Sequence, residues 1–175
     1  MAQGAVVIVG AGHAGFQLAA SLRQHGFGER ICLVNDEAHL PYQRPPLSKA
    51  YLKGEGRPDS LMFRPDKFYR DQNVDLIADR AASIDRAARR LLLVSGSSLD
   101  YGHLVLATGA RNRLLDLPNA NLEDVRYLRI LDESEALFGA LARRVASFEL
   151  TGEPQLRLNN TLRGLDTLPL RVVPA

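Results

Sequence analysis

Short apolar runs alternate with amphipathic stretches in the first part of the chain. Ala5 to Val9 and Ile31 to Val34 are continuous runs rich in aliphatic residues, which is typical of strands buried on both faces of a parallel sheet. Between them, Ala14 to Gln24 carries apolar residues at helical spacing, and Gly26 follows where a helix would end. The pattern predicts a strand–helix–strand unit at the start of the chain.

Further apolar runs predict the remainder of one α/β domain. Two more buried strands are expected at 74–77 and 104–106, and the second ends at the sequence Ala107-Thr108-Gly109. Three short runs, two of them separated by a Gly-Ser turn, favour a small antiparallel sheet. We expect its strands at 82–85, 91–94 and 99–101, short helices at 47–53 and 66–72, and a longer helix at 132–143.

The periodic pattern ends at Arg143. Residues 144–175 show no sustained period, and they are interrupted by Pro154, Gly164, Pro169 and Pro174. We therefore expect one domain at 1–143 and an atypical, irregular tail at 144–175.

The composition is that of an ordinary globular protein, with 46% hydrophobic and 24% charged residues. A formal net charge of +2 gives no argument for binding to nucleic acid or to a membrane surface. No uninterrupted apolar stretch approaches the roughly 18 residues of a membrane span. We expect a cytoplasmic protein.

Cysteine and histidine suggest neither a redox pair nor a metal site. Cys32 is the single cysteine, and its apolar surroundings predict a small core residue. His25, His39 and His103 are scattered without metal-ligand spacing, so no bound metal is predicted.

The strongest local motif is a glycine pattern between the first strand and the first helix. Gly10 is suited to a tight turn, Gly12 to the close approach of a pyrophosphate, and Gly15 to close packing of helix on sheet. The helix N-terminus would then present N–H groups to the phosphates. The motif predicts a Rossmann-like dinucleotide-binding fold with a parallel sheet.

An acidic residue after the second strand completes this fingerprint. Asp36 and Glu37 both lie there, and we favour Asp36 for the adenosine ribose because it comes first after the strand. A carboxylate at this point accepts hydrogen bonds from both ribose hydroxyls. His13 lies inside the turn, where we expect it to pack or to donate a hydrogen bond near phosphate rather than to act in catalysis.

Four segments together distinguish FAD from NAD by resemblance. The first segment is the glycine motif. The second consists of Asn35-Asp36-Glu37 and the run from Leu40 to Lys49, which contains R-P-P-L-S-K. The third is the strand that ends in A-T-G at Gly109, and the fourth is Tyr127-Leu128-Arg129. Over residues 5 to about 142 the chain closely resembles the ferredoxin reductase family. These flavoproteins pass electrons from NADH to a small iron–sulfur protein that often serves a cytochrome P450 or a dioxygenase.

The resemblance implies a set of FAD contacts and no catalytic side chain. Gly12 and Ala14 would approach the diphosphate, Lys49 would lie near the flavin ring, and Arg129 would reach the phosphate side. The full set of implied cofactor-binding residues is Gly10, Gly12, His13, Ala14, Gly15, Asp36, Arg44, Lys49, Ala82, Ala107, Thr108, Gly109 and Arg129. Ala82 would contribute its backbone to the adenine, and Arg44 is suited to phosphate oxygens.

The chain departs from the family after Arg143. Family members carry a second glycine fingerprint for NADH and a returning segment that completes the FAD domain, and neither follows here. We expect a truncated FAD domain, with a frameshift or early stop as the leading explanation and a split gene or degraded paralogue as alternatives. Without the NADH site, enzyme activity of this chain is left open. The alternative function is a non-catalytic dinucleotide-binding remnant.

Overall fold

The computed structural model describes residues 4–118, 120, 122, 125–158, 163–167 and 169–175. These residues divide into two compact units, Met1–Ala120 and Asn121–Ala175. The sequence predicts a domain boundary at residue 143, where the regular hydrophobic pattern ends. That boundary stays a prediction.

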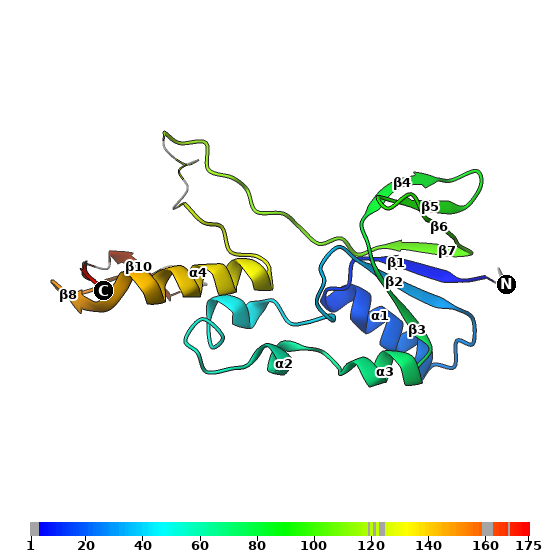
Figure 1. The fold of residues 1–175 in the computed structure, drawn as a ribbon, viewed down its shortest axis with the longest axis horizontal. Coiled ribbons are helices and arrows are strands. Elements are labelled where there is room, and N and C mark those ends of the chain that lie inside the picture. Colours follow the sequence, from blue (N-terminus) through cyan, green and yellow to red (C-terminus); the bar gives the residue numbers. More distant parts are fainter. Residues whose placement is uncertain (1–3, 119, 121, 123–124, 159–162, 168) are drawn as a thin grey trace. The chain divides into compact units, whose positions relative to one another are not determined.

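A four-stranded parallel sheet forms the centre of the first unit (Figure 1). Its order is β3-β2-β1-β7, and its strands are β1 (Val6–Val9), β2 (Ile31–Asn35), β3 (Val74–Ala78) and β7 (His103–Leu106). The chain builds outward from β1 to β3 and then returns to place β7 on the other side of β1. The carboxyl ends of β1 and β7 therefore meet where the strand order reverses, which is the usual position of a ligand crevice in such sheets.

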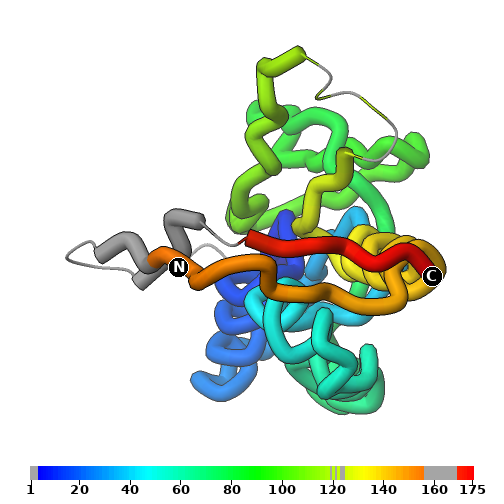
Figure 2. Tube along the Cα trace, turned by 90° about the vertical axis from the view of Figure 1, so that its left-hand side faces the viewer, coloured from blue at the N-terminus to red at the C-terminus, as the bar shows by residue number. Residues whose placement is uncertain are grey.

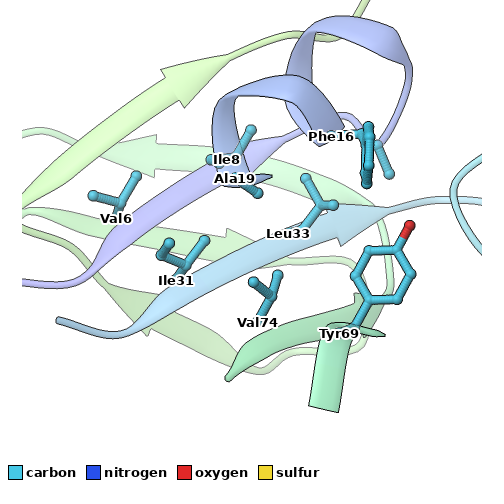
Figure 3. Close-up of a cluster of buried hydrophobic side chains, with 9 residues drawn as sticks. Val6, Ile8, Phe16, Ala19, Ile31, Leu33, Tyr69 and Val74 are labelled. Atoms are coloured by element: carbon cyan, nitrogen blue, oxygen red, sulfur yellow. The ribbon is translucent and has the colours of Figure 1, made fainter. Parts of the chain in front are cut away.

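One face of the parallel sheet is covered by helices α1 (His13–Gln24) and α3 (Asp66–Asp71). Figure 3 shows this cluster, in which the helices contribute Phe16, Ala19 and Tyr69. The strands contribute alternate residues, as the two-residue period of a strand requires. These are Val6, Ile8, Ile31, Leu33 and Val74.

The opposite face is covered by the small antiparallel sheet, so the unit has three layers (Figures 1 and 2). The sheet has the order β4-β5-β6, with β4 at Ala81–Asp85, β5 at Arg90–Leu93 and β6 at Ser98–Asp100. Leu91 and Leu93 pack in one cluster with Cys32. As predicted, Cys32 is a core residue, and burial raises the pKa of its thiol.

The segment between β2 and β3 differs from the expected short helix at 47–53. A single 3-10 turn, η1 (Pro45–Ser48), replaces it, and a short helix that the sequence did not predict, α2 (Pro58–Leu61), follows. Pro45 and Pro46 have no N–H to donate, and Gly54 turns the chain with a φ of 75°. After Ser48 the N–H groups of Tyr51, Lys53 and Gly54 donate to carbonyl groups five, four and three residues back, so no regular helical ladder forms.

Arg23, near the C-terminus of α1, ties three parts of the chain together through backbone carbonyl groups. Its guanidinium donates to the carbonyl oxygens of Phe27 at 2.5 Å and Glu29 at 2.8 Å. It also donates to those of Gln72 and Asn73, both at 2.7 Å. The end of α1, the loop before β2 and the turn before β3 are thus joined by one side chain.

The second unit contains regular structure where an irregular tail was expected. Helix α4 (Leu131–Arg144) leads directly into β8 (Val145–Leu150), which pairs antiparallel with β11 (Leu170–Pro174). Figure 2 shows β8 and β11 side by side, in orange and red. Strands β9 (Gln155–Leu158) and β10 (Arg163–Thr167) form a second antiparallel pair. The strands are short and interrupted, which explains why no sustained period marks them in the sequence.

Tyr69 generates a prediction about alkaline stability. Its side chain is 2% exposed, and its hydroxyl has no hydrogen-bond partner among the described residues. Burial raises the pKa of Tyr69 to about 12, above the value of about 10 for an unfolded chain. Between these values the unfolded chain loses the proton while the folded chain keeps it. The contribution of Tyr69 to stability is therefore complete below pH 10 and is lost as the pH rises towards 12.

We expect urea titrations from pH 9 to 12 to show wild-type protein losing roughly 2 kcal/mol of unfolding free energy relative to Tyr69→Phe. At pH 7 the variant should be as stable as wild type or more stable by about 1 kcal/mol, because it buries no unsatisfied hydroxyl. Parallel curves for the two proteins above pH 10 would contradict this assignment.

Candidate functional site

Three predicted glycines meet at the carboxyl end of β1. Gly10 has a φ of 106°, which only glycine adopts readily, and its N–H donates to the carbonyl of Val34 at 2.9 Å. A Cβ placed on Gly10 would lie 2.3 Å from the carbonyl oxygen of Ala107. No side chain therefore fits between the turn and the end of β7.

Gly15 closes the other side of the same turn. A Cβ there would lie 1.8 Å from the carbonyl oxygen of Gly10 and 3.3 Å from the side chain of Ile8. Helix α1 thus begins in direct backbone contact with the turn, as the third position of the fingerprint requires.

Gly12, unlike Gly10 and Gly15, has open space beside it. No atom lies within 4 Å of a Cβ placed on it, so the turn has open space at this one position. Gly12 is also the N-cap of α1 and provides no side-chain cap. The N–H groups at a helix start have no intrahelical partner and favour an anion. The combination provides a place where a phosphate can approach the backbone.

The predicted A-T-G segment lies beside this turn. The Ala107 N–H donates to the carbonyl of Val9 at 2.8 Å, which extends the β1–β7 ladder to the crevice. Thr108 and Gly109 are exposed, and Gly109 turns the chain with a φ of 67°. The structure therefore brings together two predicted segments that lie far apart in the sequence.

Asp36 and Glu37 follow β2, and their side chains differ in surroundings. Asp36 is exposed, whereas the side chain of Glu37 is 9% exposed. Glu37 forms an ion pair with Arg44 and accepts a hydrogen bond from the Tyr42 hydroxyl at 2.5 Å. The Asn35 amide donates to the carbonyl of Glu37 at 3.0 Å. This arrangement leaves Asp36 as the acid that faces solvent at the end of β2.

The ion pair of Glu37 and Arg44 was not predicted. Sequence reasoning assigned Arg44 to phosphate and kept Glu37 only as a second choice for the ribose. A signal was present, because a Glu, a Tyr and an Arg lie within eight consecutive residues of a proline-rich loop that folds back on itself.

The other predicted residues of the first unit are placed as follows. His13 is exposed, and its ring lies edge-on to Phe63 with centroids 4.7 Å apart. Ala14 is exposed in the first turn of α1, and Lys49 is exposed directly after η1. Ala82 falls in a register shift of the β4–β5 ladder, between the pairs of Ala81 and Ser83. A β-bulge would leave its extra residue outside the ladder hydrogen bonds, and a backbone contact of Ala82 with the adenine stays a prediction.

Arg129 belongs to the second unit, where it directly precedes the start of α4. Its backbone N–H donates to the Glu133 carboxylate at 2.6 Å, and the same carboxylate accepts from Ile130 N–H at 3.1 Å. A phosphate contact by Arg129 stays a prediction.

The described residues contain no group of three or more His, Cys, Asp or Glu side chains arranged to hold a metal ion. None of the helices in the described ranges has both the length and the apolar character to cross a bilayer.

Comparisons with known proteins match most of the chain. Residues 4–147 match the family model described as "Pyridine nucleotide-disulphide oxidoreductase". Rhodocoxin reductase of Rhodococcus erythropolis is 49% identical over 138 residues, which cover 78% of this chain and 32% of the relative.

Two solved structures share the fold of this region. The ferredoxin reductase for the CYP199A2 system from Rhodopseudomonas palustris has a TM-score of 0.77 and 65% identity, covering 81% of this chain and 35% of that one. Putidaredoxin reductase in its covalent complex with putidaredoxin has a TM-score of 0.73 and 40% identity, with the same coverage. The chain spans about a third of the length of these relatives.

The glycine turn generates a paired prediction. Gly15→Ala should lower the unfolding free energy by about 2 kcal/mol or more, because its Cβ meets backbone that must move. Gly12→Ala should cost about 1 kcal/mol or less, since its φ of −72° suits any residue and the space is open. Urea unfolding of both variants tests this difference, and equal losses would contradict the assigned roles.

Proposed function

The chain belongs to the pyridine nucleotide-disulphide oxidoreductase family, and we propose that it is the FAD-binding part of an NADH-dependent ferredoxin reductase. In this proposal electrons go from NADH through FAD to an iron–sulfur protein that serves a cytochrome P450 or a dioxygenase. The names of the relatives support this direction, since one is a reductase for a CYP199A2 system and another forms a complex with putidaredoxin.

The observation that carries the proposal is the contrast between Gly12 and its two neighbours in the motif. Backbone fills the space beside Gly10 and Gly15, whereas the space beside Gly12 is open at a helix start. A flat, side-chain-free surface next to N–H donors fits the diphosphate of a dinucleotide. The open backbone at Gly12 therefore fits the diphosphate of FAD.

The remaining predicted residues have separate tasks in holding the cofactor. Asp36 would accept hydrogen bonds from the adenosine ribose, and its negative charge would disfavour a 2′-phosphate there. Arg44 would provide positive charge towards the diphosphate. Ala82 would offer backbone groups from its bulge to the adenine.

FAD supplies the redox chemistry when bound, by accepting a hydride and releasing single electrons. The side chains of this chain then need to bind, orient and exclude water, and none is assigned as acid, base or nucleophile. Lys49 is proposed to lie near the flavin ring, where a cation favours negative charge on the ring. The NADH site and the docking of the iron–sulfur partner are assigned to the longer reductase and not to residues described in this chain.

Flavin retention is the primary test. After incubation with FAD and desalting, the wild-type chain should keep structured visible absorbance bands near those of a bound flavin. Gly12→Ala should weaken the FAD dissociation constant by at least about tenfold, because its methyl group occupies the phosphate approach. Colourless wild-type protein that is folded by circular dichroism would overturn the proposed function.

Asp36→Asn provides a second test of the adenosine end. It should weaken FAD binding by about tenfold, the loss expected for a charge-assisted hydrogen bond. Asp71→Asn is the matched control, because Asp71 is an exposed acid on α3 paired with Lys67 and is expected to leave affinity unchanged. Dye reduction by NADH above the free-flavin background would exclude the alternative function, a non-catalytic dinucleotide-binding remnant.

A further inference from the structure

Glu37, Tyr42 and Arg44 form a compact polar cluster after the carboxyl end of β2, referred to below as the Glu37 cluster. One carboxylate oxygen of Glu37 pairs with Nη2 of Arg44, and the other accepts the Tyr42 hydroxyl at 2.5 Å. Nη1 of Arg44 lies 3.5 Å from the same hydroxyl, and the guanidinium carbon lies 5.4 Å from the centroid of the Tyr42 ring. The arginine is thus held by a charge, a hydroxyl and a ring at once.

The cluster is fixed to the backbone through Tyr42. Tyr42 is 3% exposed and forms an antiparallel bridge with Met62. On either side of it, Gln43 N–H donates to the Leu61 carbonyl and Phe63 N–H donates to the Pro41 carbonyl, both at 2.9 Å. The hydroxyl that orients the Glu37 carboxylate therefore has a defined position before any ligand arrives.

Burial differs between the two charged members of the cluster. The Glu37 side chain is 9% exposed and the Arg44 side chain is 28% exposed. The negative charge is therefore compensated inside the cluster by Arg44 and Tyr42, while the Arg44 side chain is partly exposed.

We propose that Glu37 is a positioning residue for FAD, which holds the Arg44 guanidinium in the orientation that meets the diphosphate. The inference rests on the proposed function and deepens it. A long arginine side chain loses considerable rotamer freedom when it binds a phosphate, and prior immobilisation reduces that loss. Glu37 thus raises FAD affinity even though its own charge has the same sign as the diphosphate.

The test is a double-mutant cycle in the full chain, with FAD dissociation constants measured by flavin fluorescence. Glu37→Gln keeps the size and the acceptor for Tyr42 but removes the charge that holds Arg44. It should weaken FAD binding by about tenfold. In the Arg44→Gln background the same change should have no further effect, because no guanidinium remains to be positioned.

The ionic-strength dependence of FAD binding provides a readout that general destabilisation does not move. Wild-type affinity should fall with salt more steeply than that of Arg44→Gln, whereas Glu37→Gln keeps the guanidinium and loses a negative charge, so its affinity should fall with salt at least as steeply as that of wild type. Asp75→Asn is the matched control, because it removes one carboxylate from an ion pair with Arg30 near the amino end of β3, away from the crevice. It should change neither affinity nor salt dependence.

Several outcomes overturn the proposal and separate it from the proposed function. Tighter FAD binding by Glu37→Gln would show that Glu37 merely neutralises Arg44, and unchanged or additive losses would show that it does not act through Arg44. If wild-type protein binds no FAD, the proposed function fails, and this inference fails with it. If Glu37→Gln does not fold, Tyr42→Phe replaces it in the test. Tyr42→Phe should weaken FAD binding by about threefold. An unchanged FAD affinity of this variant would overturn the proposal.

Discussion

Direct backbone contact at the end of β1 is the constraint on which the first unit depends. The carbonyl of Gly10 touches the start of α1 at Gly15, and the carbonyl of Ala107 touches the Gly10 turn. A strand, a helix and a second strand thereby converge without side chains between them. Because interior atoms are close-packed, a methyl group at either glycine displaces backbone rather than a flexible neighbour. The open space at Gly12 is framed by these two closed positions.

The sequence was a good guide to the elements that bury apolar runs. The strands β1, β2, β3 and β7 and the helix α1 lie within a residue or two of their predicted bounds, because continuous aliphatic runs and glycine punctuation mark them directly. The 3-10 turn at Pro45–Ser48 and the tail strands were not predicted. Irregular backbone hydrogen bonds replace a helical ladder after the first. The strands β8 and β11 have almost no buried residues, so no continuous buried apolar run marks them in the sequence.

The site was predicted in part, for related reasons. Glycine roles follow from backbone sterics and are visible in sequence, so Gly10, Gly12 and Gly15 could be assigned in order. The partner of Arg44 could not, because side-chain pairing depends on how the loop after β2 folds. Similarly, four carbonyl groups from two separate turns converge on Arg23, and no spacing rule indicates such a convergence. The partners of long polar side chains depend on how loops fold, which local sequence patterns do not show.

The contact between Gly10 and Ala107 also constrains when this part of the fold can form during synthesis. Gly10 is among the first residues made by the ribosome, whereas Ala107 follows after the helices and the antiparallel sheet of the unit. Contacts between residues far apart in the sequence carry a larger loop-closure cost and form more slowly than local ones. The turn that forms the floor of the proposed phosphate site is therefore complete only when β7 docks. A nascent chain that stops short of β7 would carry the complete glycine motif and still have no rigid cradle for a nucleotide.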